Sequence, residues 1–171
     1  VGTGVAVGIG VAVGIGVAVG GIAVGLAVQM AIAQSRNQNI VGVNHVGIAV
    51  PDLDAALTYY TETLGFPEAF RVTNDAGEIA LIYVQVSENT FVELQPVNDN
   101  RPAGLNHFGI HVDDMDAAIS MFRARGAEVQ DSRVSSTHAV LSNIIDPDGI
   151  RMELSELPPA SLHWQAMDRW K

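Results

Sequence analysis

The sequence predicts an α+β fold built from two copies of one supersecondary unit, and three observations support this prediction. Residues 44–56 recur at 106–118, with nine identities among thirteen positions at a constant offset of 62. A short acidic strand at residues 91–94 returns at 151–154. Apolar runs of strand length are separated by turn residues in both copies. A duplicated unit is the simplest explanation of all three.

The first unit, expected at residues 40–98, begins with a strand and a helix. Residues 43–50 alternate in polarity, as a half-buried strand does. Asp52 or Asp54 can cap the helix that follows, and Gly65 suits its end. The apolar stripe of this helix is expected to consist of Leu53, Leu57, Tyr60 and Leu64.

The second unit, expected at residues 104–157, repeats this pattern. Its helix presents Met115, Ile119 and Phe122 on one face and ends near Gly126. In each unit two or three strands follow the helix, and the strand-like runs are 79–86, 90–97, 139–145 and 150–155. A strand, a helix and further strands in each unit place the chain in the α+β class.

The alternation of side chains along the strands indicates where the polar groups lie. Because side chains alternate between the two faces, His45 lies opposite the apolar face that packs on the helix. His107 has the same position in the second unit, and small residues accompany both histidines. Glu93 and Glu153 likewise oppose the apolar side chains of their own strands. We therefore expect two imidazoles and two carboxylates on the concave face of the sheet, related by a pseudo-twofold axis.

This combination of groups predicts a metal site. Inward-facing carboxylates are costly unless they are paired, protonated or bound to metal, and two of them repel each other. A single buried histidine is more often a core residue, but four such groups repeating in register favour a metal. One zinc, nickel, cobalt, manganese or iron ion suits two imidazole nitrogens and two carboxylate oxygens. The expected ligands are His45, Glu93, His107 and Glu153.

Taken together, these motifs resemble the vicinal oxygen chelate superfamily, also called the glyoxalase/bleomycin resistance/dioxygenase fold, over about residues 40–157. The motifs are the His45 strand with its helix through Phe66, Val-Glu-Leu at 92–94, the His107 strand, and Asp-Pro-Asp-Gly at 146–149 leading to Met-Glu-Leu at 152–154. The resemblance implies two paired βαβββ modules that form an open, cup-shaped mixed sheet with helices outside. It places the metal positions of glyoxalase I and methylmalonyl-CoA epimerase on the same four residues. Glu93 looks more like glyoxalase I, because the epimerase branch often has glutamine there.

The resemblance also implies a metal-dependent lyase, isomerase or epimerase that acts on a small substrate with vicinal oxygens. Glu153 or Glu93 would act as general base, and an enediolate would form beside the metal. Ala49 stands where glyoxalase I typically has an arginine for glutathione, so the glyoxalase reaction itself is not transferred. Two alternatives stay open: a drug- or metabolite-binding protein of the bleomycin-resistance type, and an extradiol-type dioxygenase, against which the carboxylate of Glu93 argues.

Other polar residues are expected near the substrate. His111 shares the face of His107 and could contact the substrate, and Gln95 and Tyr83 could line the cup. Arg151 could hold an anionic group, although a surface salt bridge is the alternative. His163, in the C-terminal tail, is expected to be structural or exposed.

Residues 1–35 carry no Asp, Glu, Lys or Arg and contain a Val-Ala-Val-Gly-Ile-Gly repeat. Their length and their regularly spaced small residues fit a membrane anchor. Residues 31–33, Ala-Ile-Ala, resemble the cleavage site of an export signal. A third interpretation places the start at Met30 and treats the upstream repeat as an artefact. If the segment is genuine, we expect an exported, periplasmic or membrane-anchored protein with membrane contact only there, and otherwise a cytoplasmic one.

Composition narrows the possible partners. With 19 acidic and 9 basic side chains the net charge is −10, so the chain should repel nucleic acid. Cysteine is absent, which excludes disulfides, thiolate zinc sites and a cysteine nucleophile. In the tail, residues 158–171, Trp164, Met167 and Trp170 predict a short amphipathic helix against the domain or a second subunit. The expected partners are a small-molecule substrate and, from the resemblance, a second copy in a homodimer.

Overall fold

The structure is a computed structural model that describes residues 38–170, so the interpretations of residues 1–35 lie outside it. The first half forms β1 (Ile40–Val50), α2 (Leu53–Thr58), the π turn η1 (Tyr59–Thr63), β2 (Glu68–Thr73), β3 (Ile79–Ser87) and β4 (Thr90–Pro96). The second half forms β5 (Gly104–Val112), α3 (Met115–Ala124), β6 (Arg133–Val134), β7 (Val140–Ile145) and β8 (Arg151–Glu156), followed by α4 (Leu162–Arg169). Each half is therefore one strand, one helical segment and three strands. No helix in the described part is both long and apolar enough to cross a membrane.

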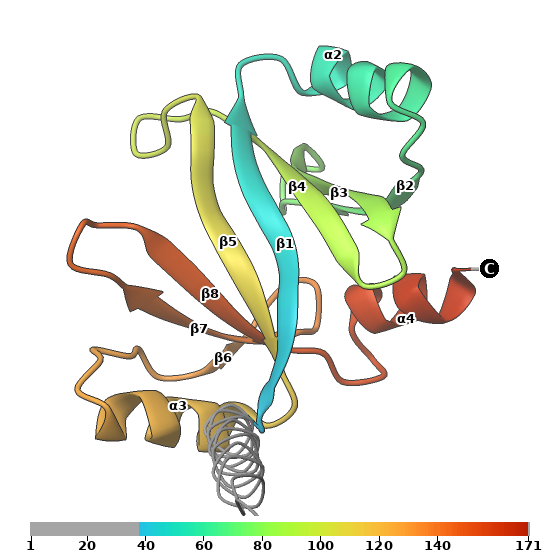
Figure 1. Cartoon of the computed structure of the whole chain (residues 1–171). Coiled ribbons are helices and arrows are strands. Elements are labelled where there is room, and N and C mark those ends of the chain that lie inside the picture. The colour runs from blue at the N-terminus through green and yellow to red at the C-terminus, as the bar shows by residue number, and fades with distance from the viewer. Residues whose placement is uncertain (1–37, 171) are drawn as a thin grey trace, which may run out of the picture. The chain divides into compact units, whose positions relative to one another are not determined.

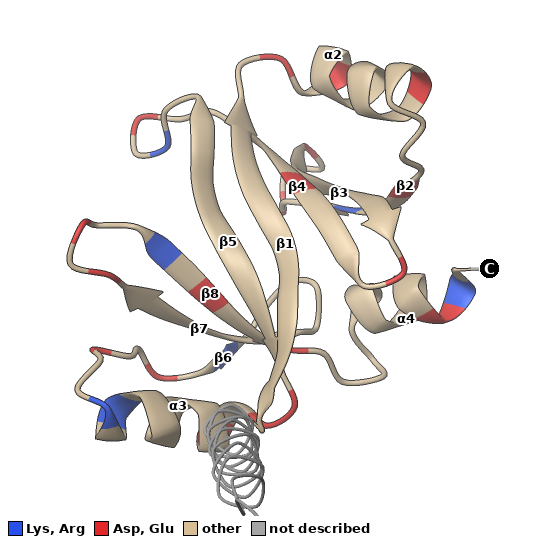
Figure 2. Cartoon of the chain, viewed as in Figure 1, with Lys and Arg blue, Asp and Glu red and all other residues tan. Residues whose placement is uncertain are grey.

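All eight strands belong to one mixed sheet, with the order β2-β3-β4-β1-β5-β8-β7-β6. At its centre β1 runs antiparallel to β5, and each of these strands pairs in parallel with the last strand of its own half, β4 or β8. Figure 1 shows β1 and β5 side by side between the two halves. Neither central strand carries a charged residue, as Figure 2 shows. The α+β class and the paired modules are confirmed.

Aspartate side chains begin both module helices. Asp52 accepts a hydrogen bond from the N–H of Ala55, and Asp114 accepts one from the N–H of Ala117. Such caps satisfy N–H groups that have no partner within the helix. Of the two candidate caps for the first helix, Asp52 is therefore the one used.

The prediction for the end of the first helix was partly wrong. The π turn after α2 lets the N–H of Leu64 reach the carbonyl of Tyr59, five residues back. A π turn inserts one residue into the helical repeat, and Leu64, expected in the core, is exposed. Phe66 packs against the core instead. Gly65 ends the segment with a φ of +76°, a conformation that suits glycine.

Each module helix covers the apolar face of its own half of the sheet. In the first half, Leu53 and Leu57 pack on a cluster that contains the fully buried Ile82 and Leu94. In the second half, the buried residues include Met115, Ile119, Val112 and Leu154. Both clusters lie on the side away from the glutamates of β4 and β8, since Leu94 and Leu154 adjoin those glutamates in sequence and point the other way.

Helix α4 lies on the opposite face. Its Ala166 forms a cluster with Tyr83 and Phe91, and Phe91 shares a face of β4 with Glu93. Helix α2 and helix α3 are therefore outside the cup, as expected, whereas α4 covers part of its concave face.

The tail helix packs against the domain as predicted, and the expected Met167 contacts two of the apolar clusters, but the prediction for the two tryptophans was wrong. Trp164 and Trp170 are exposed, while His163 and Ala166 are buried. A small alanine and a planar imidazole fit against the aromatic rings of the sheet. Ser161 is buried and caps the helix by accepting a hydrogen bond from the N–H of Trp164.

Candidate metal centre

Two histidines meet where the two central strands pair. His45 lies opposite Gly109, and His107 lies opposite Gly47, in the antiparallel β1–β5 pair. Their Nε2 atoms are 3.0 Å apart. A Cβ on Gly47 would lie 2.0 Å from the His107 ring, and a Cβ on Gly109 would lie 2.0 Å from the His45 ring. Each imidazole therefore lies over the backbone of a glycine on the neighbouring strand.

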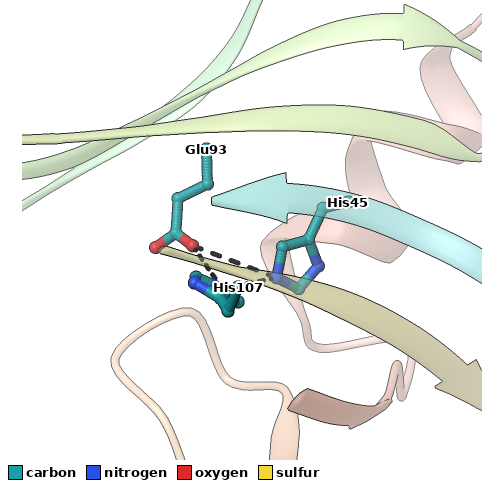
Figure 3. Close-up of side chains that lie close together, drawn as sticks. All are labelled: His45, Glu93 and His107. Atoms are coloured by element: carbon teal, nitrogen blue, oxygen red, sulfur yellow. Dashed lines mark hydrogen bonds and ion pairs between the residues drawn. The ribbon is translucent and has the colours of Figure 1, made fainter. Parts of the chain in front are cut away.

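Both glutamates face this pair of histidines. The Oε2 atom of Glu93 lies 3.0 Å from Nε2 of His107 and 3.9 Å from Nε2 of His45. The Oε1 atom of Glu153 lies 3.6 Å from Nε2 of His45. Figure 3 shows His45, Glu93 and His107 converging from β1, β4 and β5. All four side chains are buried, so the structure brings together the four residues that the repeat singles out.

The asparagine before each histidine orients its imidazole. Oδ1 of Asn44 lies 3.1 Å from Nδ1 of His45, while Nδ2 of Asn44 donates to the carbonyl of Asn89. Because a carbonyl oxygen only accepts, we assign the proton of His45 to Nδ1, which leaves the lone pair on Nε2. Oδ1 of Asn106 lies 2.6 Å from Nδ1 of His107, but a terminal nitrogen of Arg151, which can only donate, lies 2.7 Å from the same Nδ1. The Nε2 lone pair of His45 therefore faces the centre of the site, whereas Nε2 of His107 carries the proton that Glu93 accepts.

The residues present fit a divalent cation. Two imidazoles and two carboxylates converge, and burial lowers the pKa of His45 to about 4, so that its ring is neutral at neutral pH. The two neighbouring carboxylates repel each other, and a cation between them removes this repulsion. One donor atom each from His45, Glu93 and His107 lies within 4.8 Å of the other two. Hydrogen bonds to the outer nitrogen are also typical of histidines that bind metal.

The two carboxylates have different environments. Burial raises the pKa of Glu153, and the negative charge of Glu93 raises it further. Burial also acts to raise the pKa of Glu93, but hydrogen bonds with His107 and Gln95 and the two nearby imidazoles bring it below its ordinary value. Nε2 of Gln95 donates to Oε1 of Glu93 at 2.7 Å. Glu93 is therefore held as an anion, and Glu153 takes up a proton more readily.

A cavity of about 450 Å³ opens beside this cluster, and Glu93, His107 and Glu153 contribute to its wall. Three arginines also line it: Arg101, Arg133 and Arg151. One third of the nine basic residues thus lie around one cavity of a chain whose net charge is −10. This concentration of positive charge favours a ligand that carries an anionic group.

Arg151 belongs to the cluster and does not form an isolated surface salt bridge. One of its terminal nitrogens donates to Oδ1 of Asn106 at 2.9 Å and lies 2.7 Å from Nδ1 of His107. The other lies 3.4 Å from Oε2 of Glu153. The guanidinium thus bridges His107 and Glu153, which both belong to the second half, while its side chain stays partly exposed.

Of the remaining expected residues, Gln95 and Tyr83 line the cavity and His111 does not. The ring of Tyr83 lies 5.6 Å from that of His45, and burial, together with the nearby charge of Glu93, raises the pKa of its hydroxyl well above the ordinary value. His111 is half-buried further along β5, and burial lowers its pKa. A substrate contact by His111 stays a prediction.

The sequence analysis missed His163. Its side chain was expected to be structural or exposed, but it is buried and lines the cavity. The spacing of His163, Ala166 and Met167 is the signal that could have found it, since residues three and four apart share a helix face.

Comparison with known proteins agrees with this geometry. Residues 44–140 match the Glyoxalase/Bleomycin resistance protein/Dioxygenase superfamily. The chain belongs to this superfamily. The uncharacterized protein YaeR of Escherichia coli is 31% identical over 122 residues, which cover 67% of this chain and 95% of YaeR. A probable chloroplastic lactoylglutathione lyase of Arabidopsis thaliana is 30% identical over 128 residues, 67% of this chain but only 35% of the plant protein.

A solved structure shows the same fold. The crystal structure of methylmalonyl-CoA epimerase from Mycobacterium tuberculosis has a TM-score of 0.61 and 26% sequence identity, with 70% of this chain and 90% of that one covered. The curled eight-stranded mixed sheet expected from the resemblance is therefore confirmed. Relatives of this chain thus include a lyase and an epimerase.

Proposed function

We propose that this protein is a metal-dependent lyase, isomerase or epimerase that acts on a small substrate with two neighbouring oxygens. The observation that carries the proposal is the meeting of two imidazoles and two carboxylates, all buried, at the wall of a cavity. The ligands proposed for one divalent transition metal are His45, Glu93, His107 and Glu153. The lyase and the epimerase among the relatives support this class of reaction.

A bound divalent metal would polarise a substrate carbonyl and so acidify the adjacent C–H. Glu153 is the proposed general base, because burial and the charge of Glu93 raise its pKa and its carboxylate lies at the edge of the cluster. Glu93, held by Gln95 and His107, would stay an anion throughout. Arg151, which lines the cavity, would compensate negative charge that develops on the substrate oxygens.

The names of two relatives suggest the first compounds to test. S-lactoylglutathione and methylmalonyl-CoA each carry a C–H next to a thioester carbonyl and at least one carboxylate. The three arginines of the cavity suit such anions. Either compound would reveal the proposed chemistry through exchange of that C–H with solvent deuterium, even if it is not the physiological substrate.

Metal content is the first test. The chain is purified without chelator or affinity metal, and metal per chain is measured by elemental analysis beside a His45→Ala/Glu153→Ala double variant. We expect about one transition metal ion per chain in the parent and loss of that ion in the variant. Little metal in both proteins after reconstitution would contradict the proposal and favour the small-molecule-binding alternative.

Deuterium exchange tests the base. Glu153→Gln removes the proposed base, so it should slow exchange of a substrate C–H by at least about a hundredfold. Glu93→Gln should mainly weaken metal binding, and excess metal should restore part of its exchange activity. If both variants exchange protons at the parent rate, neither glutamate moves the proton.

A further inference from the structure

His163 is a buried imidazole without a hydrogen-bond partner. It is 2% exposed, and neither Nδ1 nor Nε2 has a partner among residues 38–170. Leaving a buried polar group unpaired is unfavourable, because the group loses its hydrogen bonds to water and gains none in the protein. The ring nevertheless lines the same cavity as Glu93 and Glu153.

The surroundings of His163 suit an apolar ring better than an imidazole. Its ring centroid lies 4.5 Å from that of Tyr83, 4.8 Å from that of Phe70 and 5.6 Å from that of Phe91. Burial lowers the pKa of His163 to about 3, so the ring is neutral and has one donor and one acceptor nitrogen. A phenylalanine would fill this place without unpaired polar atoms, so packing alone does not account for a histidine.

The nearest polar rings already have other partners. Nδ1 of His45 faces Asn44, and its Nε2 faces His107. The hydroxyl of Tyr83 shares a hydrogen bond with Glu93. No side chain of residues 38–170 therefore pairs with His163, and the cavity that the residue lines is the space from which a partner can come.

Helix α4 fixes His163 at this position. The N–H of Leu162 donates to the carbonyl of Thr137 at 2.9 Å, and Thr137 itself lines the cavity. Ser161 caps the helix, and Nε2 of Gln85 lies 3.5 Å from the carbonyl of Ala166. An imidazole on an anchored helix is well suited to hold a ligand in one orientation.

We propose that His163 is a substrate-binding residue whose imidazole forms a hydrogen bond with a hydroxyl or carbonyl oxygen of the substrate. This inference rests on the proposed function and adds to it a contact from the C-terminal helix, outside the duplicated modules. In this arrangement the quartet of proposed metal ligands (His45, Glu93, His107 and Glu153) and the imidazole of His163 serve different oxygens of one substrate molecule. A substrate for this site therefore carries at least one oxygen beyond the pair next to the reacting C–H.

The test uses His163→Phe, His163→Gln and, as a control on the exposed side of the same helix, Trp164→Phe in the full chain. Metal content, melting temperature, and KM and kcat for deuterium exchange of S-lactoylglutathione and methylmalonyl-CoA are measured for each. We expect His163→Phe to raise KM about tenfold or more with metal content unchanged. His163→Gln should recover part of the loss, and Trp164→Phe should match the parent.

The melting temperature without substrate shows, independently of turnover, whether His163 serves the substrate or stabilises the fold. If His163 serves the substrate, His163→Phe should melt at the same temperature as the parent or a few degrees higher. A fall of several degrees would show that the imidazole supports the fold, and an unchanged KM in a stable variant would also overturn the inference. Absence of exchange in the parent would instead count against the proposed function, while the melting comparison would still decide whether the imidazole supports the fold.

Discussion

The imidazole of His45 occupies the space that any side chain at Gly109 would need. A Cβ on Gly109 would lie 2.0 Å from Cε1 of His45, and the same relationship holds between Gly47 and His107. The two glycines therefore belong to the candidate metal centre as much as the histidines do. They are also the reason that two imidazoles on paired strands can bring their Nε2 atoms to 3.0 Å.

Replacement of Gly109 by alanine should displace the His45 ring and weaken metal binding at least about tenfold. Overpacking of this kind typically also lowers the free energy of unfolding by about 1–3 kcal/mol. Gly42→Ala is the matched control, because a Cβ at Gly42, on the same strand as His45, would meet nothing within 4 Å. Competition with a metal-sensitive dye measures the affinity. Equal affinity in both variants would show that the ring is free to move without loss of the site.

The hydrogen bond from His45 to Asn44 should also matter for metal binding. Asn44→Ala removes the acceptor that fixes the tautomer of His45, and loss of such a contact typically lowers metal affinity about 10–100-fold. Asn44→Asp keeps an oxygen at this place and should retain most of the affinity. Isothermal titration with zinc compares the two variants. A pair of equally weakened variants would point to the contact between Asn44 and Asn89 instead.

Mild acid should destabilise the metal-free chain. Burial lowers the pKa of His45 to about 4 and that of His163 to about 3, from 6.5 in the unfolded chain; near His163, Glu93 opposes this shift, while His45 and His111 add to it. Because each pKa is lower in the folded state, the unfolded state binds protons first, and stability falls as the pH drops below 6.5.

The size of this effect can be measured. Each imidazole contributes about 1.4 kcal/mol per pH unit, or about 3 kcal/mol between pH 6.5 and pH 4. Urea unfolding in the presence of a chelator should show this loss, and His163→Phe should remove one imidazole's share of the slope. Identical slopes in the parent and in His163→Phe would mean that the His163 ring is protonated in the folded state.

The cap of α4 should stabilise the C-terminal segment. Ser161→Ala removes the side-chain oxygen that accepts from the N–H of Trp164 and should lower the free energy of unfolding by about 0.5–2 kcal/mol. Ser161→Asp keeps an acceptor but buries a charge, so Ser161→Thr is the better control. Thermal unfolding measures the melting temperatures, which should fall in the order parent, threonine variant and alanine variant. Equal melting temperatures for all three would show that the end of the helix is held by packing alone.

The duplicated pattern predicted much of the fold and of the site. Because a strand has a side-chain period of two, the parity of His45, Glu93, His107 and Glu153 placed all four on one face before their pairing was known. Alternation along a strand could not predict which residues of β1 lie opposite which residues of β5, since this depends on pairing between segments 62 residues apart. A homodimer stays a prediction, as does a role for His111 in substrate binding.

Local patterns failed where tertiary packing chose between two alternatives. The turn at Tyr59 is helical by pattern, yet an added residue in that turn exposes Leu64. In α4, the large apolar side chains predicted that the face with the tryptophans would be buried. The aromatic rings on the concave side of the sheet instead pack against the face with the smaller side chains, which includes His163. In both cases hydrophobicity was a weaker guide than the space available.

The pairing of β1 with β5 has a consequence for folding cooperativity. His45 and Glu93 belong to the N-terminal half of the described chain, while His107 and Glu153 belong to the C-terminal half, so separation of the halves dismantles the quartet. Any cation held there would bind only when both halves are folded and joined, and its binding free energy would stabilise their association. Two modules with separate apolar cores would then lose structure in a single transition, and removal of the cation would allow one half to open before the other.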